Sequence, residues 1–340
     1  MVWGLAVFYH ARNELEKAIE MGRSLVDVAE RARDPALLIA ASISVGCPQL
    51  WQGEFAACLE WMERAIALYD SEQHRGLAYV YGESPGVAAR VYAAMALWHL
   101  GFPDRALRMI ENAVAVAEDA VHPFSRAYAL CFNAAIHHMR RERAAVRHAA
   151  DAAIAFAEAQ HLAFWLDIGR FHRAWALAEP ETGPAALEAM ESAVARLASN
   201  GTEVGAPSML EIFADAYGAF GRIDDALRTI DNALALADLR QCPFWNAELL
   251  RSKGELLLRR DGAKARGDAE ELFRRALATA RGQEARSFEL RTAVSLARLL
   301  RQQGRTADAR ALLAPAYAWF TEGHDTADLR DARSLLDELS

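Results

Sequence analysis

Three stretches that lie far apart in the chain share one pattern of small and large residues. They read GFPDRALRMIENA (residues 101–113), GRIDDALRTIDNA (221–233) and GRTADARALLAPA (304–316). Each has a glycine, an alanine five residues later, a large apolar residue after four more and a second alanine after three more. Residues at spacings of four and three lie on one face of a helix, and small ones let a neighbouring helix approach closely. The pattern therefore predicts repeated pairs of packed helices.

The same pattern recurs, with substitutions, along the whole chain. Its first small residue stands at positions 18, 58, 106, 145, 186, 226, 269 and 309. An amphipathic helical stretch precedes the pattern in each unit, and no useful length of sequence alternates as a strand does. We therefore predict an all-α fold, a right-handed superhelical solenoid of antiparallel helix hairpins with a period of about 40 residues.

This repeat makes residues 1–340 a single solenoid domain. Its eight units are expected at residues 1–32, 34–70, 84–120, 123–160, 162–200, 204–239, 242–283 and 286–323. A C-terminal capping helix is expected at 325–339, where leucines can pack inward while charged residues cover the end of the array. The spacing between corresponding residues of successive units is longest from the second unit to the third. We assign the extra residues to an irregular loop at 71–84.

The irregular loop contains HRGLAYVYGESPG (residues 74–86), which differs in composition from the helices around it. Two interpretations are open. In the favoured one, the aromatic side chains pack over the edge of a hairpin, as in a compact surface loop. In the other, the loop is a lip that contacts a ligand or an upstream domain through Arg75 and Tyr81.

The repeats resemble a known class. Residues Phe213, Ala214, Tyr217, Gly221, Ala226, Ile230 and Ala233 follow the tetratricopeptide pattern, and the longer period is similar to that of MalT-type regulators. The chain as a whole resembles the C-terminal repeat region of bacterial signalling ATPases, often fused to class III adenylate or guanylate cyclase, kinase or LuxR-type DNA-binding domains. The segments that carry this resemblance are ALYDSEQHRGLAYVYGESPGV (67–87), HPFSRAYAL (122–130), FWLDIGRFHRAWALAE (164–179), FWNAELLRSKGELLL (244–258) and WFTEGHDTADL (319–329).

Composition argues against several classes of partner. A net charge of −8 does not suit nucleic acid, and no apolar run approaches the roughly 18 residues of a membrane helix. We therefore expect a cytoplasmic protein that binds neither. The first residues are apolar and lack a helix cap, so Met1 is expected to be a cut or an internal start. The cysteines form no C-x-x-C pair and are expected to be buried free thiols: Cys47, Cys58, Cys131 and Cys242.

No motif in the sequence indicates catalysis. The phosphate-binding pattern G-x-x-x-x-G-K-[ST] is missing, and no nucleophile elbow or cyclase segment is recognisable. His137 and His138 are adjacent, so on a helix they point about 100° apart and do not chelate one metal together. We therefore predict a chain that is not an enzyme and holds no cofactor or metal.

The predicted superhelix has a concave groove, which in tetratricopeptide solenoids is lined by the first helix of each pair. Its N-terminal half should be apolar and aromatic, with Met95, Trp98, His137, Phe171 and Trp175 as candidate binding residues. Its C-terminal half should be charged, through Glu211, Asp215, Glu248, Arg251, Glu255, Arg291, Arg298 and Arg301. The alternative is that tight curvature buries the N-terminal set as ordinary core.

These features favour a regulatory interaction module in signal transduction. It would bind a partner peptide, a partner protein or the upstream domains of its own protein in the groove. Glu248, Arg251 and Arg298 would meet the polar part of the ligand, with Arg75 and Tyr81 as a second candidate surface. The alternative is a sensor for a small molecule, either an anionic one with an apolar body or a sugar-like inducer.

Overall fold

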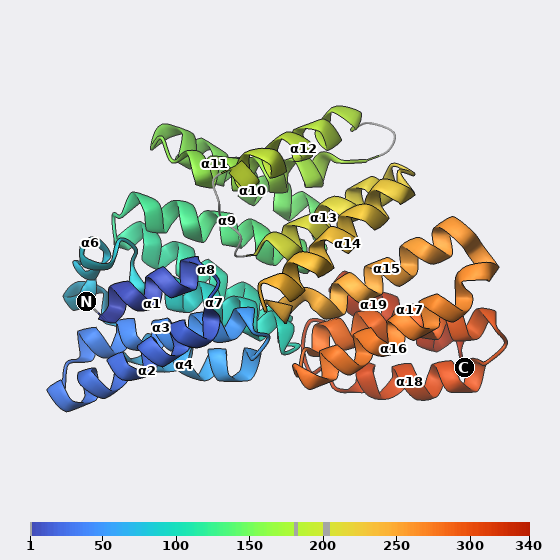
Figure 1. The fold of residues 1–340 in the computed structure, drawn as a ribbon, viewed down its shortest axis with the longest axis horizontal. Coiled ribbons are helices and arrows are strands. Elements are labelled where there is room, and N and C mark those ends of the chain that lie inside the picture. The colour runs from blue at the N-terminus through green and yellow to red at the C-terminus, as the bar shows by residue number, and fades with distance from the viewer. Residues whose placement is uncertain (1, 180–182, 200–204) are drawn as a thin grey trace.

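The computed structural model describes residues 2–179, 183–199 and 205–340, and every regular element in these ranges is a helix (Figure 1). The first five hairpins and the segment between them comprise α1 (Val2–Ala11), α2 (Leu15–Ala32), α3 (Pro35–Trp51), α4 (Phe55–Leu68), α5 (Ser71–His74), α6 (Leu77–Tyr81), α7 (Pro85–His99), α8 (Pro103–Asp119), α9 (Pro123–Met139), α10 (Arg143–Ala159), α11 (Ala163–Leu177) and α12 (Pro184–Ser199). The rest comprises α13 (Ala206–Ala219), α14 (Ile223–Leu239), η1 (Pro243–Trp245), α15 (Asn246–Asp261), η2 (Gly262–Ala265), α16 (Arg266–Gly282), α17 (Arg286–Gln302), α18 (Thr306–Ala318) and α19 (Ala327–Glu338). The expected junction of the fifth and sixth units, like Met1, lies outside the described residues.

The small residues of the repeated pattern lie where helices pack. Five alanines of the frame have no exposed surface, which confirms the packing role that their spacing predicts: Ala65, Ala113, Ala193, Ala233 and Ala276. Without a side chain beyond Cβ, each lets the partner helix of its hairpin approach closely. The fold is thus the predicted all-α solenoid of helix hairpins.

The solenoid curves so tightly that hairpins far apart in sequence touch. Ser287 Oγ on α17 donates a hydrogen bond of 2.5 Å to the carbonyl oxygen of Trp98 at the end of α7. In the turn before α19, the Glu322 carboxylate accepts bonds of 2.9 and 2.8 Å from the backbone N–H groups of Asp104 and Arg105 on α8. In Figure 1 the blue-to-teal helices therefore meet the orange-to-red ones.

Gly101, one of the repeated glycines, serves this closure as well as the local turn. Its φ of +87° lies in the left-handed region, which glycine adopts without strain, and it directly follows Leu100, the C-cap of α7. A Cβ at this position would come within 2.6 Å of the Trp319 ring. The sequence therefore has glycine both to end the helix and to admit the C-terminal hairpin.

The segment 71–84 is more regular than the predicted irregular loop. It contains the short helices α5 and α6, and the Asp70 carboxylate caps α5 by accepting the N–H groups of Glu72 and Gln73. Tyr81 packs on Trp3 of α1 with ring centroids 4.9 Å apart, whereas Tyr79 stays 72% exposed. The Asp70 cap and the αR geometry of Arg75 and Gly76 make helical turns in a segment that the longer repeat step had marked as an irregular loop.

The C-terminal helix α19 covers the last hairpin as predicted. Leu329, Leu335 and Leu339 are buried in one cluster with the apolar residues of α17 and α18. At the other end of the solenoid, α1 leaves Leu5 and Phe8 exposed. The two ends therefore differ, because the charged outer face of α19 caps only the C-terminal end.

Two expectations from composition can be compared with the described residues. All four cysteines are free and buried. None of the helices within 2–179, 183–199 and 205–340 has the length and apolar character needed to cross a bilayer.

Candidate functional site

The inside of the superhelix holds two neighbouring cavities, lined largely by the first helices of the hairpins. One has a volume of about 250 Å³ and apolar walls, and the other has a volume of about 390 Å³ and charged walls. We call them the apolar cavity and the charged cavity. His138 of α9 lies in the wall of both.

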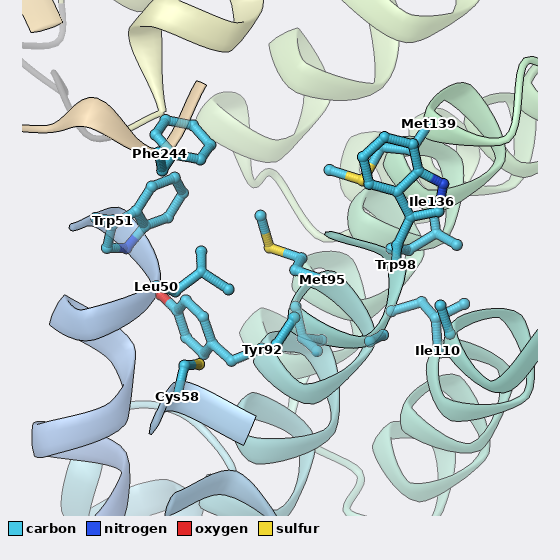
Figure 2. Packing of buried hydrophobic residues seen from close by; sticks show 14 of the residues in the cluster. Leu50, Trp51, Cys58, Tyr92, Met95, Trp98, Ile110, Ile136, Met139 and Phe244 are labelled. Atoms are coloured by element: carbon cyan, nitrogen blue, oxygen red, sulfur yellow. The ribbon is translucent and has the colours of Figure 1, made fainter. Parts of the chain in front are cut away.

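The apolar cavity is built from helix faces that the sequence makes apolar. Trp51 at the end of α3 meets Phe244 of η1 edge to face, with ring centroids 4.7 Å apart. Figure 2 shows this pair on one side, Met139 on the other, and Met95 of α7 pointing into the space between them. Other lining residues are Tyr92, Cys131, Phe132, Trp165, Ile168, His172 and Met209. Such walls suit an aromatic or aliphatic group of a ligand.

Glu248 of α15 is the centre of the charged cavity. Its side chain is 3% exposed and accepts two bonds from Arg251, at 2.9 and 2.8 Å, and one from Arg291 of α17 at 3.2 Å. Burial alone would raise the pKa of Glu248, but the two guanidinium groups outweigh it and lower the pKa to about 2. Glu248 is therefore ionised, and it occupies both arginines.

Glu211 of α13 lies beside this group in a different electrostatic situation. Ser252 Oγ donates a bond of 2.6 Å to Glu211 Oε1. Burial, followed by the nearby charges of Glu248 and Asp215, raises the pKa of Glu211 to about 7. The charged cavity thus contains one carboxyl group that changes its charge near neutral pH.

Some charges that line this cavity have no ion-pair partner among the described residues. Arg298 of α17 is exposed and makes no hydrogen bond there, and Arg143 donates only to the Trp175 carbonyl oxygen, at 2.7 Å. Asp215 and Glu255 likewise form no hydrogen bond or ion pair within the described ranges. Uncommitted groups of both signs therefore face one space.

His138 was missed by the sequence analysis, which selected its neighbour His137. The His138 ring packs on Trp175 with centroids 4.0 Å apart, and burial lowers its pKa well below the usual range, so the ring is neutral. Its Nδ1 atom is buried without a hydrogen-bond partner. His137 lines neither cavity, and its Nδ1 lies 2.6 Å from Glu142 Oε2. The sequence placed His137 on the inward face of α9, whereas in the structure the inward face lies one residue further along, at His138.

The other candidates fall into two groups. Met95, Trp175, Glu248, Arg251 and Arg298 line the cavities. Trp98 and Phe171 do not. Trp98, 2% exposed, is covered by Phe288 of α17, and Phe171, 0% exposed, lies in the local core with Met190 of α12. Trp98 still supports the site, since the Arg291 guanidinium lies 4.8 Å from its ring centroid. Arg75 directly follows α5, and Tyr81 is the last residue of α6. Neither lines a cavity.

The arrangement offers binding groups. Within the described ranges no group of three or more His, Cys, Asp or Glu side chains is placed to hold a metal ion. Cys131, in the wall of the apolar cavity, has a pKa raised by burial, which keeps its thiol protonated. The cavities provide apolar surface, charges of both signs and hydrogen-bond donors.

Comparison with known proteins identifies the fold. No protein-family model and no curated protein matches the sequence. Among solved structures, a Rap protein complexed with competence and sporulation factor superposes with a TM-score of 0.62 at 12% identity, over 99% of this chain and 96% of that one. Yeast Tom70 superposes with a TM-score of 0.47 at 14% identity, over 96% of this chain and 59% of Tom70. A signal transduction ATPase with numerous domains and a tetratricopeptide repeat sensor, from Pyrococcus horikoshii, superposes with a TM-score of 0.49 at 14% identity. The match covers 95% of this chain and 54% of the ATPase.

These likenesses concern the fold alone, because all the identities are low. The chain spans less than two thirds of the length of Tom70 and of the archaeal ATPase, and nearly the whole of the Rap protein. Together with the helix hairpins described above, the superposition on the Rap protein shows that the chain is a tetratricopeptide-like helical solenoid.

Proposed function

We propose that the chain is a non-catalytic binding module that regulates a signalling protein, with its binding site inside the superhelix. The observation that carries the proposal is the pair of neighbouring cavities, one apolar and one charged, that meet at His138. The apolar cavity can bury an anchoring side chain, worth about 1.5–3 kcal/mol for a residue such as leucine or phenylalanine. The charged cavity can then fix the orientation of the rest of the ligand.

The small volumes of the two cavities, about 250 and 390 Å³, favour a short ligand, either the end of a partner peptide or a free molecule. The contacts of Ser287 with Trp98 and of Glu322 with Asp104 join the third hairpin to the C-terminal part of the solenoid. The resemblance to the Rap protein complexed with competence and sporulation factor supports a ligand-binding solenoid of this shape. A sensor for a small molecule is therefore the second candidate, and the small volume of the two cavities is the observation that favours it.

A variant that fills the apolar cavity tests the proposal. Ala135, half-buried in its wall, can be replaced by phenylalanine, with Ala135→Ser as the matched control. Trp175→Ala is less suitable as a test of binding. The Trp175 side chain is only 5% exposed, so its truncation also removes packing contacts and costs about 3–5 kcal/mol of stability.

The assay is thermal unfolding of each variant against a library of short peptides and small metabolites. We expect compounds that raise the melting temperature of the wild type and of Ala135→Ser but not of Ala135→Phe. Arg298→Glu should weaken the binding of the same compounds, and the loss should depend on salt concentration. Arg333→Glu, on the outer face of α19, should leave their binding unchanged. Equal responses of the wild type and Ala135→Phe would contradict a site inside the superhelix.

A further inference from the structure

The charged cavity has two acid–arginine pairs of positions on the helices α15 and α17. At the first pair the charges form an ion pair, and at the second, called the open level below, they do not. Glu248 of α15 and Arg291 of α17 form an ion pair across neighbouring helices, at 3.2 Å. Glu255 and Arg298 stand seven residues further along the same two helices, which is about two turns and therefore the same faces. Both line the cavity, yet neither has an ion-pair partner within the described ranges.

We propose that this open level receives a zwitterionic ligand of the amino-acid or short-peptide type. Its ammonium group lies against Glu255 and Asp215, its carboxylate lies on Arg298, and its apolar side chain enters the apolar cavity past His138. This inference rests on the proposed function and adds the chemical class of the ligand.

The balance of charge in the cavity argues for a zwitterion over an anion. Its lining includes six carboxyl groups and five guanidinium groups, and Arg251 and Arg291 are already held by Glu248. A ligand with negative charge alone would meet the uncommitted Glu255 and Asp215. We therefore favour a zwitterion over the anionic ligand that the sequence also allowed.

Two buried polar atoms without partners indicate where the ligand brings a hydrogen-bonding group, and the Trp175 indole N–H among them calls for an acceptor. Trp175, 5% exposed, lines the charged cavity, and its indole Nε1 has no hydrogen-bond partner. The same holds for Nδ1 of the adjoining His138. Buried polar atoms are nearly always hydrogen-bonded in folded proteins. An amide carbonyl between the charged end and the apolar side chain of a peptide would meet this pair at the boundary of the two cavities.

The test uses the dipeptide Leu-Phe and two blocked forms, N-acetyl-Leu-Phe and Leu-Phe-amide, in calorimetric titrations of the whole chain. We expect the free dipeptide to bind at least tenfold more tightly than either blocked form. Arg298→Gln should abolish the preference over the amide, and Glu255→Gln the preference over the acetylated form. Arg333→Gln, on the exposed face of α19, should leave both preferences unchanged.

Equal affinities of the free and blocked dipeptides would overturn the inference, and so would preferences that survive both substitutions. If no dipeptide binds while Ala135→Phe still removes the response to other compounds, the zwitterionic ligand is wrong and the interior site stands. If Ala135→Phe also leaves every response unchanged, the proposed function itself is refuted.

Discussion

Glu211 offers a test of the electrostatics of the charged cavity that needs no ligand. Its pKa is raised to about 7 because the group is buried and faces Glu248 and Asp215, while the Ser252 hydroxyl and Arg251 oppose the shift. Glutamine has the same shape and still accepts the bond from Ser252 Oγ. Glu211→Gln therefore removes the titrating charge and little else.

The size of the effect follows from linkage between protonation and folding. A carboxyl group whose pKa is higher in the folded state contributes stability that is present at low pH and is lost as the pH rises through the folded value. With an unfolded pKa of 4.5 and a folded pKa of about 7, ionisation costs the wild type about 1 kcal/mol at pH 5. At pH 8 the cost is about 3 kcal/mol. The stability of Glu211→Gln relative to the wild type should therefore rise by about 2 kcal/mol between these pH values.

Urea unfolding followed by circular dichroism at pH 5, 6, 7 and 8 measures this difference. Glu83 also has a pKa raised to about 7 by burial, but its contribution cancels because it is present in both proteins. Glu188→Gln, at an exposed position of α12, is the control and should follow the wild type. A difference between Glu211→Gln and the wild type that does not change with pH would refute the assignment of a raised pKa.

Three further predictions concern the scaffold. Glu248→Gln should cost about 3–5 kcal/mol in urea unfolding, because Arg251 would lose its ion pair in a largely buried place, while Arg291 would keep only Asp328. A loss below about 1 kcal/mol would contradict this. Ala233→Leu should overpack its hairpin and cost about 1–3 kcal/mol, and an unchanged melting temperature would undercut the repeat alignment. Deletion of residues 325–340 should lower both solubility and melting temperature, since it uncovers the last hairpin, and unchanged values would remove the capping role of α19.

The fold could be read from the sequence because its determinants are local and repeated. A spacing of four and three between small residues selects helix pairs wherever it occurs, and the buried Ala113 and Ala233 show the same contact in different hairpins. The leucines of α19 identified the cap for the same reason, since an amphipathic stretch after the last repeat has one apolar face to bury. The segment 71–84 was less predictable, because its length breaks the repeat, and the Asp70 cap and the packing of Tyr81 on Trp3 order it as short helices.

The candidate site was only partly predictable, and the reason is curvature. The sequence determined that the inside of the solenoid would be apolar toward the N-terminus and charged toward the C-terminus, since that depends only on which helix faces inward. How far each inward residue stays accessible depends on small rotations added from hairpin to hairpin, which no single repeat encodes. Tertiary structure therefore decided that Trp98 became core when Ser287 reached its carbonyl oxygen, and that His138 came to lie between the two cavities. It also decided which charges are neutralised, because Glu248 meets Arg291 only through the packing of α15 against α17, while Glu255 and Arg298 stay apart.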